Sequence, residues 1–169
     1  IGGVYRRCLA VGHHLRALPA GSDRHGDAFF DIDYPVGASL FVTHKYLEAV
    51  GMMDDTYFLY YEEMDWAERG RRLGFRPAVA LRSLVQHKEG ASTGSHGGVR
   101  NKSILSERYG IINRLRITQK FWPRYLPVVW SSLWLVILER LVHREWNRAG
   151  LVLKLMFSPC LWILRRKHD

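Results

Sequence analysis

DYPVGASLFVTHKYLEAVGMMDDTYFLYYEEMDWAERGRRLGFR, residues 33–76, is the stretch that decides the predicted fold. Its first part, Tyr34–Val42, is apolar and β-prone, which favours a strand. His44–Val50 follows as a short helical turn that Gly51 is placed to cap. A longer helix is predicted from Glu62 to Leu73, because acids stand at its start, bases at its end and a glycine after it. A strand that leads into helices indicates an α/β fold.

The chain beyond this stretch changes from strand to helix. Phe75–Gln86 alternates apolar and polar residues imperfectly, which predicts a strand that ends at His87. Gly90–Gly98 is rich in glycine and serine and is the best boundary in the chain. We therefore expect two domains, residues 1–96 and a helical tail, residues 97–169.

Helices dominate the predicted tail. Asn101–Phe121 carries a broad apolar stripe between basic positions, and Pro123 and Pro127 end that helix and begin another. Tyr125–Leu138 is uncharged, but a straight membrane crossing needs about 20 apolar residues. The pattern therefore indicates a buried, interfacial or re-entrant segment.

Composition separates the two parts as clearly as pattern does. The chain has 169 residues and a net charge of +9. Residues 1–96 hold 11 basic and 12 acidic side chains, whereas residues 97–169 hold 14 and 4, together with five of the six tryptophans. Such a basic region favours an anionic partner, either nucleic acid or a membrane surface. The two cysteines, Cys8 and Cys160, exclude a disulfide framework and a cysteine-rich zinc site, which fits a reducing compartment.

The densest acidic feature is YYEEMDW, residues 60–66. Glu62 and Glu63 are expected to point in different directions from the first helical turn, while Glu62 and Asp65 share a face. A carboxylate in a partly apolar, aromatic pocket has its charged form disfavoured, which suits a general base. The alternative is that these acids only complement the helix dipole.

Two further features could hold a cation. His87, at a strand end beside a Gly/Ser loop, could offer a ring nitrogen to a metal or a phosphate, or could be an ordinary loop residue. Asp31 and Asp33 imitate a divalent-metal motif, although a short acidic pair before a strand is commonly just solvated. The sequence contains no phosphate loop, nucleophile elbow or dinucleotide fingerprint.

The chain resembles the second half of a family-2 glycosyltransferase domain of the GT-A fold, most closely its rhamnosyltransferase-like branch. The resemblance lies in the order of three parts: residues 33–76, the predicted strand that follows, and HKEGASTG at 87–94. The resemblance covers about residues 33–123. Its order and spacing are more specific than any single part. It implies a partial GT-A domain followed by a tail similar to membrane-docking helices.

The resemblance also implies roles for individual residues. Glu63 corresponds to the general base, where the family often has Asp. The other catalytic and substrate-binding positions expected are Glu62, Asp65, Gly37, Ala38, Ser39 and Trp66. His87 corresponds to a histidine that in many members contacts the metal on the donor diphosphate, so Mg²⁺ or Mn²⁺ is the implied cofactor.

The implied reaction is an inverting transfer from a nucleotide-sugar donor to a hydroxyl of a glycan or lipid-linked acceptor in cell-envelope synthesis. The nucleotide-binding half is expected upstream of residue 1. The chain also begins with Ile1 and lacks the zones of a signal peptide. We therefore expect a partial transferase with little donor affinity of its own.

The alternative from another class is a non-catalytic docking module for an anionic membrane surface. In either case the expected location is the cytoplasmic face of the inner or plasma membrane, peripheral or re-entrant. Nucleic acid is not an expected partner, because the tryptophans lie within apolar runs rather than alternating with arginine on a polar face.

Overall fold

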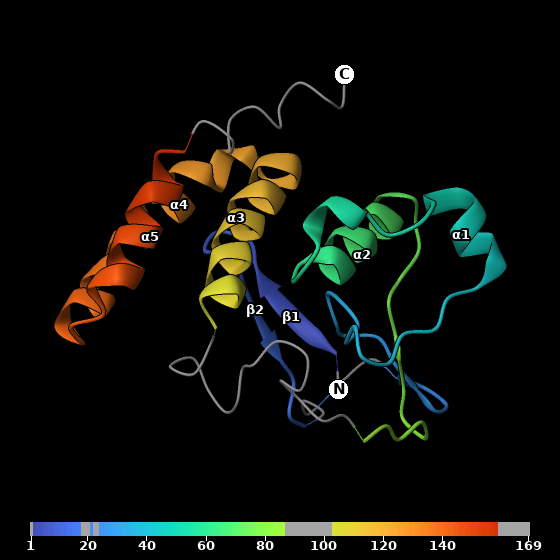
Figure 1. Ribbon diagram of the computed structural model, residues 1–169. Helices are drawn as coiled ribbons and strands as arrows, with labels where there is room; N and C mark the ends of the chain where they lie inside the picture. The colour runs from blue at the N-terminus through green and yellow to red at the C-terminus, as the bar shows by residue number, and fades with distance from the viewer. Residues whose placement is uncertain (1, 18–20, 22–23, 87–102, 159–169) are drawn as a thin grey trace. The chain divides into compact units, whose positions relative to one another are not determined.

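The computed structural model describes residues 2–17, 21, 24–86 and 103–158. The chain forms two compact units, one of Ile1–Arg6 with Val11–Lys88 and one of Arg7–Ala10 with Glu89–Asp169. The architecture is mixed and mostly helical, with small antiparallel sheets (Figure 1). The expected mixture of helices and strands is confirmed at this coarse level. Residues 96 and 97 lie outside the described ranges, so the predicted domain limits stay a prediction.

The helices of the first unit begin and end where their capping residues predict. In α1, His44–Val50, the Thr43 hydroxyl accepts a hydrogen bond from the Tyr46 amide at 3.2 Å, and Gly51 ends the helix with φ 78°. Helix α2, Glu62–Arg72, has its acids in the first turn and its bases in the last. Both helices therefore confirm the prediction from residues 33–76.

An aromatic cluster packs α1 against α2. The Tyr46 ring contacts the rings of Trp66 and Phe75 edge-on, with 5.1 Å between the ring centres in each pair. The Tyr46 hydroxyl also donates to the Trp66 carbonyl at 2.7 Å. A Cβ on Gly70 would lie 2.5 Å from the same ring. Glycine at position 70 is therefore what lets α2 approach Tyr46 so closely.

The strands of the first unit are short. β1, Gly3–Arg6, pairs antiparallel with β2, Val11–His14. A second sheet has the order β3–β4–β5, from Arg24–His25, Ala28–Phe29 and Val79–Ala80, all antiparallel. The paired strands bring residue 80 beside residue 28, which are far apart in the sequence.

The predicted strand Tyr34–Val42 is wrong. Only Tyr34 forms a bridge, to Gly3, and the rest is turn and irregular chain. The Tyr34 ring packs on the glycine face of the β1–β2 hairpin, and the Ser39 amide donates back to Val36 at 3.1 Å. The chain therefore turns at Gly37–Ser39 instead of continuing along a sheet. The predicted strand Phe75–Gln86 is present only as Val79–Ala80. The two-residue strand β4 pairs with these two residues.

The second unit is a helical bundle. It consists of α3, Ile104–Phe121, a 3₁₀ turn η3, Pro123–Tyr125, α4, Leu126–Val142, and α5, Trp146–Met156 (Figure 1). Pro123 is the first residue of η3 and Pro127 the second residue of α4, so the prolines stand at helix starts as predicted. The core lies between the helices and is formed by Ile111, Leu115, Ile117, Val129, Leu133, Ile137, Val152, Leu155 and Met156.

Candidate active site

The start of α2 places two glutamates in a strained turn. Phe58, Tyr60 and Tyr61 have φ values of 57°, 67° and 73°, although none is glycine. Tyr61 is the residue before the helix and provides no side-chain cap. Such backbone costs roughly 1–3 kcal/mol per residue and gathers at functional sites. The strained backbone directly before Glu62 and Glu63 therefore indicates a functional role for this turn.

The two glutamates form one acidic pair. Burial raises the pKa of Glu63 to about 7, and the nearby charge of Glu62 and a hydrogen bond between the two side chains add to this effect. Against this, the Glu63 backbone amide donates to the carboxylate and lowers the pKa. The prediction that the two side chains diverge is wrong. Their carboxyl groups lie close enough for Glu62 to raise the pKa of Glu63, although adjacent helix positions face different ways.

Neither glutamate is fully paired within the described part of the chain. Atom Oε2 of Glu62 and atom Oε2 of Glu63 are buried, and neither has a hydrogen-bond partner among the described residues. A buried oxygen without a partner costs about 1–3 kcal/mol. The pair is therefore equipped to accept a hydrogen bond or a proton from a hydroxyl group that reaches it.

Gly37 lies opposite this pair. A Cβ on Gly37 would be 3.9 Å from Cδ of Glu63, and that glutamate is the only side chain such an atom would meet within 4 Å among the described residues. The structure thus brings together two predicted site positions that are 26 residues apart in the sequence. Ala38 and Ser39 are exposed in the same turn, and their predicted contact with substrate stays a prediction.

Tyr34 is a neighbour that the sequence did not indicate. Its side chain is buried, and burial, with the charges of Glu63 and Asp33, raises its pKa to about 12. The hydroxyl therefore keeps its proton at neutral pH. Only Gly3 and Gly12, whose missing side chains make room for the ring, could have hinted at this packing, and both are remote in sequence.

Asp65 and Trp66 support the turn from within. Asp65 is fully buried and accepts hydrogen bonds from the Tyr57 hydroxyl at 3.0 Å and from Nε of Arg69 at 2.8 Å. The buried Trp66 indole donates to the Gly51 carbonyl at 2.8 Å. These contacts are structural, and the predicted contact of Trp66 with a substrate stays a prediction.

Comparisons with protein-family models, with curated proteins and with solved structures each found no match. The chemistry of the acidic pair therefore has to be argued from its own residues.

The described residues do not fit a divalent-cation site. Within residues 2–17, 21, 24–86 and 103–158, no three His, Cys, Asp or Glu side chains gather closely enough to hold a metal ion. Asp33 is engaged elsewhere, because it accepts from the Tyr5 amide at 2.7 Å, and Asp31 is exposed. The predicted ligand His87 lies outside the described residues, so the Mg²⁺ or Mn²⁺ expectation stays a prediction.

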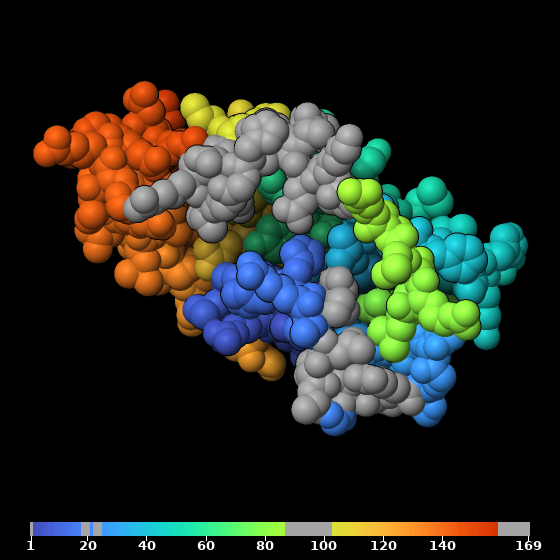
Figure 2. Space-filling view, turned by 90° about the horizontal axis from the view of Figure 1, so that it is seen from below, coloured from blue at the N-terminus to red at the C-terminus, as the bar shows by residue number. Residues whose placement is uncertain are grey.

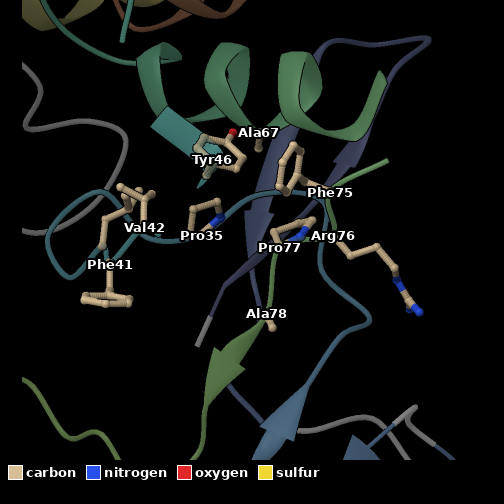
Figure 3. Close-up of a pocket in the computed structure, with 10 residues that line it drawn as sticks. Pro35, Phe41, Val42, Tyr46, Ala67, Phe75, Arg76, Pro77 and Ala78 are labelled. Carbon is tan, nitrogen blue, oxygen red and sulfur yellow. The ribbon is translucent and has the colours of Figure 1, made fainter. Parts of the chain in front are cut away.

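A pocket of about 240 Å³, lined mostly by apolar and aromatic residues, lies next to the α1–α2 packing. Figure 3 shows Pro35, Tyr46 and Phe75 around it, while the Arg76 guanidinium points away. That guanidinium lies over the Phe30 ring at 5.2 Å. The pocket and the acidic pair are separate features, although the loop from Pro35 to Val42 contributes to both.

Proposed function

We propose that this chain provides the acceptor side of a glycosyltransferase of the GT-A type, with Glu63 as the general base. The observation that supports this most is the acidic pair, in which burial and a second carboxyl group keep Glu63 protonated up to about pH 7. A base of this kind binds a proton well at neutral pH and releases it readily. The resemblance of residues 33–123 to that family supplies the reaction.

In the proposed reaction, ionised Glu63 accepts the proton of an acceptor hydroxyl as that oxygen attacks the anomeric carbon of the nucleotide-sugar. The bond from the anomeric carbon to the diphosphate oxygen breaks, and the nucleoside diphosphate leaves with the electron pair. The displacement inverts the anomeric centre. While Glu63 is protonated, its carboxyl proton is shared with Glu62, and this hydrogen bond is lost when Glu63 ionises. Gly37 lies against Glu63 without a side chain that would cover the carboxyl group.

Glu63→Gln tests this role in the complete protein in which this sequence occurs. Release of nucleoside diphosphate is measured with a panel of nucleoside diphosphate-sugars, rhamnose included, and acceptors with free sugar hydroxyls. We expect kcat to fall about 100-fold or more while the donor KM stays the same, because amide nitrogen and oxygen cannot take the proton. The wild-type rate should rise with pH up to about 7 and then level off.

Glu48→Gln is the matched control, because Glu48 is an exposed carboxylate on α1 whose ion pair among the described residues is with the exposed His44, at 3.5 Å. Its rate should equal that of the wild type. Unchanged transfer by Glu63→Gln would remove Glu63 as the base.

A non-catalytic membrane-docking module is the second candidate. It is favoured by the apolar residues that α4 exposes, among them Leu135 and Leu138. This candidate predicts no transfer by the wild-type protein with any donor and acceptor. The two candidates therefore differ in the same assay.

A further inference from the structure

The outer face of α4 is apolar over most of its length, with Ser131 and Glu139 as its exposed polar residues. Its exposed residues recur at spacings of three and four, so they form one stripe along the helix. The stripe comprises Val128, Ser131, Trp134, Leu135, Leu138, Leu141 and Val142. Leu135 and Val142 are each 70% exposed and Leu138 is 58% exposed. A soluble surface rarely carries an apolar run of this size without a partner.

The opposite face of α4 already has its partners. Val129, Leu133 and Ile137 are buried in the bundle, and the indole of Trp130 donates to the Met156 carbonyl of α5 at 3.1 Å. Figure 2 shows the orange and red-orange atoms of α4 and α5 as one continuous surface. The outer stripe is therefore not the side on which this bundle closes.

Besides this stripe, the helical unit exposes aromatic rings and an excess of cations. Trp146 and Phe157 of the α5 segment are 66% and 61% exposed. Over residues 120–157 the exposed cations are Lys120, Arg124, Arg144 and Lys154, whereas Glu139 is the only exposed carboxylate. Aromatic rings suit the boundary between lipid headgroups and chains, and Lys and Arg suit anionic headgroups.

We propose that the outer stripe of α4 docks on an anionic lipid bilayer, with the helix lying in the plane of the membrane surface. The apolar side chains enter the boundary between headgroups and chains, and the excess of exposed cations on the same helical unit is attracted to the headgroup charges. A second copy of the chain fits less well, because a symmetric contact through this face would set like charges against each other.

The geometry of α4 favours a helix lying on the membrane over one that spans it. By length and composition alone, Pro123–Val142 could cross a membrane, and only 22% of its apolar window is buried. The helix itself has 17 residues, which span about 25 Å, short of the roughly 30 Å hydrocarbon layer. Its last turns also hold Arg140, whose Nε donates to buried Glu107 at 2.8 Å. Crossing would pull this ion pair out of the bundle.

Flotation of the complete chain with lipid vesicles tests the proposal. The vesicles contain either phosphatidylcholine alone or three parts phosphatidylcholine to one part phosphatidylglycerol. We expect flotation with the anionic vesicles, and about tenfold or more weaker partitioning for Leu135→Glu/Leu138→Glu, because acidic side chains enter the boundary poorly and repel anionic headgroups. Circular dichroism at 222 nm establishes that the variant keeps its helices.

Leu84→Glu is the control, since Leu84 is an equally apolar residue, 93% exposed, in the other unit. It should float like the wild type. Equal losses in both variants, no flotation of the folded wild type, or a concentration-dependent dimer that Leu135→Glu/Leu138→Glu abolishes would each overturn the proposal. None of these residues belongs to the acidic pair, so flotation and sugar transfer can fail independently.

Discussion

The Glu63 carboxyl group links the stability of the first unit to pH. Its pKa of about 7 in the folded protein lies above the ordinary value of 4.5, because burial and Glu62 disfavour the charge. The folded state therefore holds more protons than the unfolded state between these two values. Stability should fall as pH rises from about 4.5 to about 7 and should stay lower above that range.

Glu63→Gln should therefore stabilise the protein at pH 8, by an amount on the order of 2 kcal/mol, because it removes a buried charge. At pH 4 the gain should largely vanish, since Glu63 is then protonated in both states. Urea unfolding at the two pH values measures the difference. A gain that is the same at pH 4 and pH 8 would contradict the assigned protonation of Glu63.

The site could be anticipated only in part from single residues. The sequence predicted Gly37 and Glu63 as parts of one site, and in the structure these two residues lie next to each other. Tyr34 could not be foreseen, because its burial depends on a hairpin about 30 residues earlier in the chain. The contact between Glu62 and Glu63 was also missed, since helical spacing describes backbone directions and ignores how long side chains fold.

At the scale of elements, helices were easier to predict than strands. The limits of α1 and α2 follow from local signals, a capping threonine, a glycine and an ordered run of charges. Strand pairing is non-local, so the apolar run after Tyr34 looked like a strand, although no described strand pairs with it along its length. The two helices predicted after residue 101 are likewise present as α3 and α4, whereas α5 was not predicted as a helix.

The β1–β2 hairpin depends on the absence of a side chain at Gly12. A Cβ there would lie 2.5 Å from the Tyr34 hydroxyl oxygen and 3.2 Å from Cε of Met64. Both neighbours are packed, so Gly12→Ala should destabilise the protein by about 1–3 kcal/mol in urea unfolding.

Gly110→Ala is the control for this prediction. Gly110 lies inside α3, and a Cβ there would meet no described atom within 4 Å. Alanine should stabilise this helix by about 0.5–1 kcal/mol. Equal effects of the two substitutions would show that the Tyr34 packing is not as tight as described.

The helical bundle contains a buried ion network that apolar patterning did not reveal. Glu107 of α3 accepts hydrogen bonds from Arg140 at 2.8 Å and from Arg148 at 2.6 Å, and Arg140 also donates to Glu145 at 2.9 Å. The Arg140 and Glu107 side chains are each only 5% exposed. Removal of Glu107 therefore takes a carboxylate from two arginines at once and leaves Arg140 with Glu145.

Glu107→Leu should destabilise the bundle by about 3 kcal/mol, the lower end of the cost of breaking a buried ion pair, because buried Arg140 loses one carboxylate and keeps Glu145. Glu107→Leu/Arg140→Leu should cost less than that single substitution, since apolar packing replaces the pair. Urea unfolding followed at 222 nm measures both, with Glu139→Leu at the exposed neighbouring position as the control. If the double variant were less stable than Glu107→Leu, the claim that burial of the Glu107–Arg140 pair is costly would be contradicted.

At the scale of the whole molecule, the division of charge in the sequence corresponds to two kinds of structure. The near-neutral part forms the mixed unit with the acidic pair, and the basic part forms the helical bundle. Chain order does not separate the units completely. The turn of the β1–β2 hairpin, Arg7–Ala10, belongs to the helical unit, which no local pattern could show.

Hydrogen bonds from Arg114 of α3 hold the hairpin turn Arg7–Ala10 on the helical unit. The Nε and Nη2 atoms of Arg114 donate to the Leu9 carbonyl at 3.1 and 2.7 Å, and Nη2 also donates to the Ser132 hydroxyl of α4 at 2.8 Å. The Arg7 guanidinium lies over the Trp122 ring at 5.6 Å, and Ala10 is fully buried. One arginine thus ties the hairpin turn to two helices.

Arg114→Met should free the turn while it leaves the helices intact. Hydrogen bonds from a charged group contribute about 1.5–3 kcal/mol, so amide hydrogen exchange in Arg7–Ala10 should become about tenfold faster or more, with the signal at 222 nm unchanged. Mass spectrometry of the peptide that covers the turn measures the rate. Arg108→Met, at an exposed position of the same helix, should leave it unchanged. Equal exchange in the wild type and in Arg114→Met would mean that the turn is held by Ala10 and Arg7 alone.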